Sequence, residues 1–153
     1  MNTSNLGELT VGYKYNSSLK GRPKISNSKD AYKVLKNLYD RDKLGLHEQF
    51  VVIYLNHANM VIGTINLFTG TTRGIMIDNK IVVGIAINLM ASSVIISHNH
   101  PSGSLKPSES DLKLTRSMGE ALELMSIKLL DHLIISPDEE YLSLVENGSY
   151  NLN

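Results

Sequence analysis

Apolar and polar residues recur along this chain with two different periods, and each period predicts a type of element. Residues 28–43 carry apolar side chains at helical spacing, and Ser28 or Asp30 could cap the first turn. We therefore expect an amphipathic helix of about three to four turns there.

Two more helices follow from the same period. Residues 79–90 present one apolar face after Asp78, whose carboxylate suits an N-cap, although Gly84 weakens the pattern. Residues 108–125 repeat the helical spacing, and Ser108 stands at the start of that pattern.

Strands are predicted where apolar, β-branched residues run together or alternate with polar ones. The segments with this pattern are 8–16, 49–56, 61–70, 91–100 and 127–148. The second and third make a hairpin, and the last makes a hairpin that turns at Pro137. Hairpins around a helix that leads into a central strand predict an α/β sandwich with a mixed sheet.

The composition limits the chemistry that this fold can carry. Of 153 residues, 42% are apolar and 20% are charged, which suits one globular domain with a hydrophobic core. No cysteine is present, so any metal must be held by histidine, carboxylate or water. Without a signal-peptide pattern or an apolar run of about 18 residues, we expect a cytoplasmic protein with no membrane partner.

Charge is unevenly distributed although the formal net charge is zero. Residues 1–47 carry nine Lys or Arg against four Asp or Glu, whereas residues 48–153 carry six against eleven. This asymmetry permits a basic N-terminal surface that contacts DNA. A solvated face explains it equally well, because the chain has no dense basic stripe.

The stretch "SHNHPSG" holds two of the five histidines. In a strand, His98 and His100 point to one face while Asn99 points to the other. Asp111 follows after a short loop. Two histidines and one carboxylate, with a fourth position left for water, form a catalytic type of zinc site. The alternative is that Ser108 and Asp111 only cap a helix and that the histidines lie in a turn.

A metal-activated water also needs a base, and Glu48 is the candidate because it directly precedes the predicted strand 49–56. A solvated loop glutamate is the alternative. In "LLDHLII", Asp131 is a candidate partner for a zinc-binding histidine, since such ligands usually donate their second N–H to an acceptor. A purely structural pair of Asp131 and His132 is the alternative there.

Taken together, Glu48 and "HNHPSGSLKPSESD" resemble the JAMM metalloprotease motif, in which a glutamate precedes His-x-His, seven residues and Ser-x-x-Asp. The stretches "KPSESDLKLT" and "KLLDHLII" resemble the RadC family, in its short form without the N-terminal helix-hairpin-helix region. The resemblance covers roughly residues 28–146 and implies an MPN/JAB, cytidine-deaminase-like fold. It divides the chain into an N-terminal strand and linker extension, 1–27, and an MPN/JAB domain, 28–150.

The resemblance also implies one zinc ion per chain, held by His98, His100 and Asp111, with Glu48 as general acid and base. Ser108 would stabilise the oxyanion of a tetrahedral intermediate. The implied activity is that of a metallopeptidase or isopeptidase that attacks an amide carbonyl of a peptide-like substrate with activated water. The alternative is a non-catalytic binding or scaffold module associated with DNA repair or mobile-element DNA.

Overall fold

The fold is built on one five-stranded sheet. A computed structural model describes residues 21–68 and 77–151, so the strand expected over 8–16 lies outside the described part of the chain. The strands are β1 (Gln49–Leu55), β2 (Val61–Phe68), β3 (Ser93–Asn99), β4 (Lys128–Ile135) and β5 (Tyr141–Ser143). Their order is β2-β1-β3-β4-β5, and only the β3–β4 pair is parallel. The predicted mixed sheet is confirmed.

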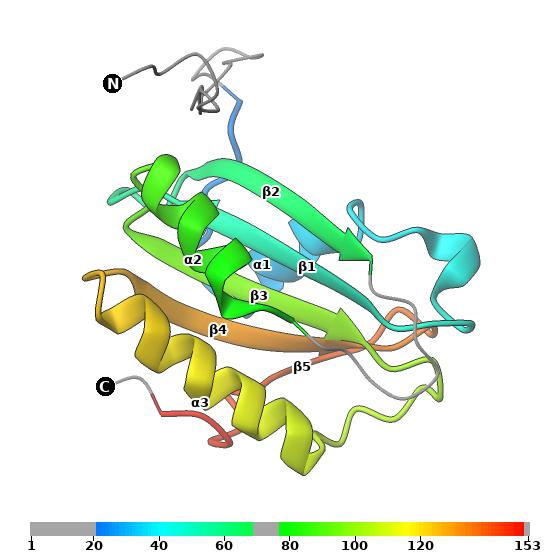
Figure 1. The fold of residues 1–153 in the computed structure, drawn as a ribbon. Coiled ribbons are helices and arrows are strands. Elements are labelled where there is room, and N and C mark those ends of the chain that lie inside the picture. Colours follow the sequence, from blue (N-terminus) through cyan, green and yellow to red (C-terminus); the bar gives the residue numbers. More distant parts are fainter. Residues whose placement is uncertain (1–20, 69–76, 152–153) are drawn as a thin grey trace, which may run out of the picture.

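Helices cover both faces of this sheet, as Figure 1 shows. They are α1 (Ser28–Leu35), α2 (Asn79–Asn88) and α3 (Glu109–Glu123). Because α2 and α3 lie on one face and α1 on the other, the predicted α/β sandwich is confirmed. None of the described helices is long and apolar enough to span a membrane.

Alternation along the central strands divides the hydrophobic core into two layers. On β1, Phe50 and Val52 pack in the layer of α2 and α3, whereas Val51 and Ile53 pack in the layer of α1. All four side chains are fully buried. Directly paired residues of neighbouring strands share a face, and Phe50 pairs with His98. The first histidine of the pair therefore points to the α3 side of the sheet.

The helix expected over 28–43 is shorter than predicted, because α1 ends at Leu35 after eight residues. Tyr39 follows it and is buried, with its hydroxyl 2.7 Å from the hydroxyl of Ser97 on β3. The chain leaves the helix where this ring enters the core. A short 3-10 helix, Arg41–Lys43, is all that remains of the expected later turns.

The N-cap of α1 also differs from the two residues expected. Asn27 caps this helix, and its side-chain oxygen accepts a hydrogen bond from the Asp30 N–H at 2.9 Å. Ser28 is instead the first helical residue, and it is buried. The caps expected for the other two helices, Asp78 and Ser108, are confirmed.

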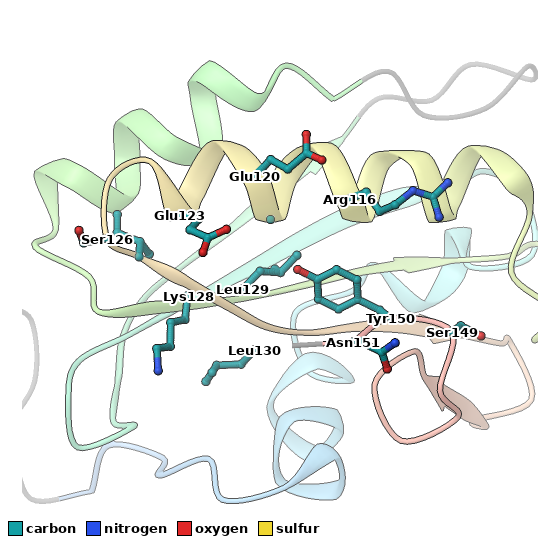
Figure 2. Close-up of a pocket in the computed structure, with 12 residues that line it drawn as sticks. Arg116, Glu120, Glu123, Ser126, Lys128, Leu129, Leu130, Ser149, Tyr150 and Asn151 are labelled. Carbon is teal, nitrogen blue, oxygen red and sulfur yellow. The ribbon is translucent and has the colours of Figure 1, made fainter. Parts of the chain in front are cut away.

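A cavity of about 850 Å³ lies between the second half of α3 and the start of β4, beside Tyr150 (Figure 2). Acidic, basic and apolar side chains all contribute to its walls. Gly119 lies so close to the Tyr150 hydroxyl that a β-carbon would clash with it. His98 and His100 do not line this cavity, so it is separate from the histidine pair.

Replacing Asn27 by alanine removes the side-chain acceptor of the α1 cap. We expect the free energy of unfolding to fall by about 1 kcal/mol, measured by urea denaturation. Asn27→Asp keeps an acceptor at the same position, so it should stay within about 0.5 kcal/mol of the original protein. Equal stabilities for Asn27→Ala and Asn27→Asp would contradict this cap.

Candidate metal centre

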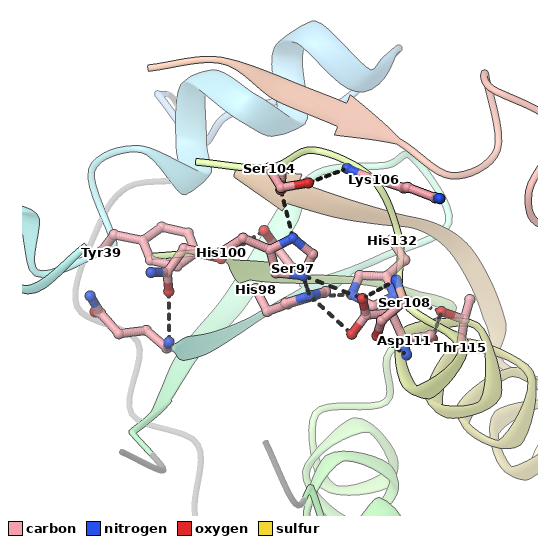
Figure 3. Close-up of polar contacts among 12 residues, drawn as sticks. Tyr39, Ser97, His98, His100, Ser104, Lys106, Ser108, Asp111, Thr115 and His132 are labelled. Carbon is pink, nitrogen blue, oxygen red and sulfur yellow. Dashed lines mark hydrogen bonds and ion pairs between the residues drawn. The ribbon is translucent and has the colours of Figure 1, made fainter. Parts of the chain in front are cut away.

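Three side chains from the end of β3, the residue after it and the first turn of α3 converge on one point (Figure 3). His98 Nε2 lies 2.9 Å from His100 Nε2 and 3.2 Å from Asp111 Oδ1. His100 Nε2 lies 3.3 Å from Asp111 Oδ2. The side chains are 2%, 13% and 14% exposed in that order, so the point is shielded but borders on solvent. These three residues could hold a metal ion.

The separations suit a tetrahedral ion. Bonds of about 2.0–2.1 Å at tetrahedral angles set neighbouring ligand atoms about 3.3 Å apart. The observed distances between the donor atoms run from 2.9 to 3.3 Å. Three nitrogen and oxygen donors without sulfur also leave a fourth position open, as in catalytic zinc sites. The residues present therefore fit the type of metal site that the sequence predicts.

The ring of His100 is oriented by the loop that follows it. Its Nδ1 lies 2.6 Å from the backbone carbonyl of Ser104, which the chain reaches through a turn at Gly103 with a φ of 79°. A carbonyl only accepts, so Nδ1 carries the hydrogen, and in the neutral ring Nε2 has a bare lone pair. That lone pair points toward His98 and Asp111. Metal-binding histidines usually have such an acceptor on their second nitrogen.

Asp111 belongs to a helix cap and to this cluster at once. Its Oδ2 accepts a hydrogen bond from the Ser108 N–H at 2.7 Å, and its own N–H donates to Ser108 Oγ at 3.1 Å, which completes a capping box. The cap fixes the carboxylate on the first turn of α3 while its oxygens still face His98 and His100. The two interpretations of Ser-x-x-Asp are therefore compatible.

The charges of the cluster favour a cation. Burial alone would raise the pKa of Asp111, but the adjacent nitrogens of His100 and His98 outweigh it and hold that pKa far below its ordinary range. The hydrogen bond to Asp111 raises the pKa of His100 against the opposing effect of burial, and the negative charge of Glu48 adds to the rise. The carboxylate is thus ionised over the ordinary pH range and available as a ligand.

Glu48 lies at the same end of the sheet as the histidines. It directly precedes β1, and two residues later Phe50 pairs with His98. Its side chain is half-buried, and its charge raises the pKa of the second histidine of the cluster. Ser108 Oγ uses a lone pair in the capping box, which leaves the hydroxyl proton available for another acceptor. The catalytic roles of Glu48 and Ser108 stay predictions.

Among the described residues, Asp131 lies beside neither histidine of the cluster, contrary to the expected role. Its carboxylate accepts hydrogen bonds from Ser143 Oγ and from the backbone N–H groups of His132 and Val145. The side chain that meets the cluster is His132, whose Nε2 lies 2.7 Å from His98 Nδ1. Sequence reasoning assigned His132 only to a structural pair.

A register shift in β4 decides which of these two neighbours faces the cluster. Leu129 packs in the layer of α3, and strict alternation would send residue 131 to the same side. Leu130, however, is an extra residue between two consecutive pairs of the β3–β4 ladder. Such a bulge reverses the alternation beyond it, so His132 faces α3 and Asp131 does not.

Asn99, between the two histidines, faces away from the cluster and organises the loop before β1. Its Oδ1 accepts a hydrogen bond from the Gln49 N–H at 2.6 Å, and its Nδ2 donates to the carbonyls of Leu44 and His47 at 2.7 and 3.0 Å. The residue is fully buried. The same strand end therefore holds the two histidines on one face and the segment that carries Glu48 on the other.

Asn99→Asp preserves size and one acceptor but removes both donors and places a carboxylate against two carbonyl oxygens. We expect the free energy of unfolding to fall by about 2–4 kcal/mol in urea denaturation, because these buried carbonyls lose their partner. Asn147→Asp is the control: the residue is exposed and its oxygen only accepts from Ser149 Oγ. That change should stay within about 0.5 kcal/mol. Similar losses for both variants would contradict the role given to the hydrogen bonds of Asn99.

Known proteins match this chain over most of its length. The sequence profile of the RadC-like JAB domain matches residues 25–149. A UPF0758 protein of Flavobacterium johnsoniae is 36% identical over 127 residues, which are 83% of this chain and 54% of the relative. One from Staphylococcus haemolyticus is 35% identical over 147 residues, which are 96% of this chain and 61% of the relative.

A third relative, from Aromatoleum aromaticum, is 42% identical over 102 residues, which are 67% of this chain and 45% of the relative. The chain thus spans about half the length of the curated relatives it matches. The profile includes the histidine pair, the capping box and β4, as the motif in the sequence led us to expect. The chain belongs to the RadC-like JAB domain family.

Proposed function

We propose that this chain is a zinc-dependent hydrolase that cleaves an amide bond in a peptide or isopeptide with an activated water molecule. The observation that carries the proposal is the convergence of His98, His100 and Asp111, whose donor atoms lie 2.9–3.3 Å apart. Three protein ligands that leave a fourth position open are typical of catalytic zinc, whereas structural zinc is held by four.

Zinc bound by these three ligands would supply Lewis acidity, which acidifies a water molecule and polarises a carbonyl. The chain's own residues do the rest. Glu48 accepts a proton from the water and returns it to the leaving nitrogen, while the hydroxyl of Ser108 donates a hydrogen bond to the developing oxyanion. The water oxygen bonds to the carbonyl carbon, the C–N bond breaks and the amine leaves with the proton. No covalent enzyme intermediate is needed.

A DNA-bound scaffold, the other class considered, has weaker support. The basic charge of residues 1–47 was its basis. Arg41 pairs with Glu139, which lies outside that segment, whereas Lys33 and Lys43 pair with Asp30 and Asp40, which the charge count already includes. Surface charges that are already paired attract a polyanion less strongly. The convergence of all three candidate metal ligands, His98, His100 and Asp111, favours the hydrolase.

Metal content tests the ligand set. Protein purified without a histidine tag, loaded with zinc and dialysed, is expected to keep about one zinc per chain in elemental analysis, whereas Asp111→Ala keeps almost none. Glu109→Ala is the matched control, because Glu109 is an exposed acid in the same helical turn. Equal zinc in Asp111→Ala and Glu109→Ala would overturn the assignment of the site.

A second prediction separates chemistry from metal binding. Glu48→Gln keeps the shape of the side chain but cannot accept the proton, so we expect it to bind zinc as the original protein does. Its hydrolysis of a fluorogenic peptide library should fall about 100-fold or more, as general-base loss usually causes. If Glu48→Gln cleaves the library at the original rate, the role given to this glutamate is wrong.

A further inference from the structure

A chain of buried hydrogen bonds runs from α3 through β4 to the first histidine of the cluster. Thr115 Oγ1 donates to the carbonyl of Asp111 at 2.6 Å and lies 2.6 Å from His132 Nδ1. His132 Nε2 in turn lies 2.7 Å from His98 Nδ1. Thr115 and His132 are fully buried and His98 nearly so. Figure 3 shows these side chains lying in a row beside α3.

We infer that Thr115 acts as a positioning residue: through His132, it fixes the tautomer in which His98 presents a bare Nε2 to the metal. The inference rests on the metal site proposed above. It assigns a function to two buried polar side chains that fold stability alone does not require, because an apolar pair of the same shape could fill the same space.

The available hydrogens decide which atom donates in each hydrogen bond between Thr115, His132 and His98. The Thr115 hydroxyl has one proton, and that proton is donated to the Asp111 carbonyl. Oγ1 can therefore only accept from His132, so Nδ1 of His132 carries its hydrogen. A neutral imidazole has one N–H, which leaves Nε2 of His132 bare. Burial disfavours a second, charging proton on that ring.

Because Nε2 of His132 is bare, it must accept from Nδ1 of His98, and the single hydrogen of His98 is therefore on Nδ1. Nε2 of His98 is left with a lone pair, which faces Asp111 and His100. His100 and His98 thus present a bare Nε2 to the metal position in the same tautomer. The Ser104 carbonyl sets the tautomer of His100, and the hydrogen-bonded pair Thr115 and His132, called the relay below, sets that of His98.

The helix itself fixes the first member of the relay. Thr115 lies four residues after Asp111, and a threonine hydroxyl within a helix can bond to the carbonyl four residues earlier. This bond keeps Oγ1 on the side of α3 that faces β4. Serine has the same hydroxyl and can replace threonine in this role, whereas valine keeps the shape and loses the bond.

The test compares Thr115→Val with Thr115→Ser. In the valine variant Nδ1 of His132 has no acceptor, so its hydrogen moves to Nε2, which donates to His98 and drives the hydrogen of His98 to its own Nε2. Zinc must then compete with that hydrogen. We expect zinc affinity to fall about 10- to 100-fold in competition with a chromophoric chelator, with Thr115→Ser within about threefold of the original protein.

Ring nitrogens report the tautomer directly and without any metal. In metal-free protein labelled with ¹⁵N-histidine, long-range ¹H–¹⁵N spectra should place the hydrogen of His98 on Nδ1, and in Thr115→Val on Nε2. A protonated Nε2 in the original protein, or the same tautomer in both, would overturn the inference. If the original protein binds no zinc, the proposed function fails, but this measurement still decides the relay.

Two controls separate the relay from a loss of folding. Asp131→Asn alters a buried neighbour of His132 that faces away from the cluster, so zinc affinity and the His98 tautomer should not change. If Thr115→Val unfolds, Thr115→Ala serves in its place, because it removes the same hydroxyl with a smaller side chain. Equal zinc affinity for a folded Thr115→Ala and Thr115→Ser would also refute the relay.

Discussion

Two nitrogen lone pairs and an ionised carboxylate repel one another at 2.9–3.3 Å unless a cation or a proton lies between them. The fold can hold them together because each is fixed by a different element. His98 lies on β3, which is paired on both sides; His100 is tied to the Ser104 carbonyl; and Asp111 is locked in a helix cap. Because the three side chains are already held in place, they would lose little conformational entropy when a metal binds, which favours binding.

At the end of β3, one face carries the candidate metal ligands and the other face holds the neighbouring loop and Tyr39 in place. The histidines point to the α3 side, and the residues between and before them, Asn99 and Ser97, point to the α1 side. Asn99 bonds to three backbone groups in the segment around Glu48. The Ser97 hydroxyl contacts the hydroxyl of Tyr39, which follows the end of α1. A shift of β3 by one residue would turn the histidines toward α1 and Asn99 toward α3, so the register of this strand is critical to the site.

The hydrogen-bond partner of His98 shows where inference from sequence fails. Asp131 has a carboxylate that could accept a hydrogen bond from a metal-binding histidine, and it directly precedes His132, the residue that contacts His98. Its side chain, however, faces away from the histidine cluster. The extra Leu130 in β4 reverses the alternation, and a bulge of this kind depends on how two strands pair rather than on the sequence of one. Buried Asp131 instead joins β4 to the residues around Ser143 and Val145.

The order of elements, the mixed sheet, the caps at Asp78 and Ser108 and the spacing of the three metal-type residues were all determined by the sequence. The elements follow from periodicity, and the caps follow from neighbours two or three residues apart. His98, His100 and Asp111 lie within one continuous stretch of the sequence. Tertiary structure alone decided where α1 ends, which side chain hydrogen-bonds to Nδ1 of His98, and which backbone groups Asn99 binds. Those rest on contacts between residues 58, 34 and 50 positions apart, which local pattern cannot encode.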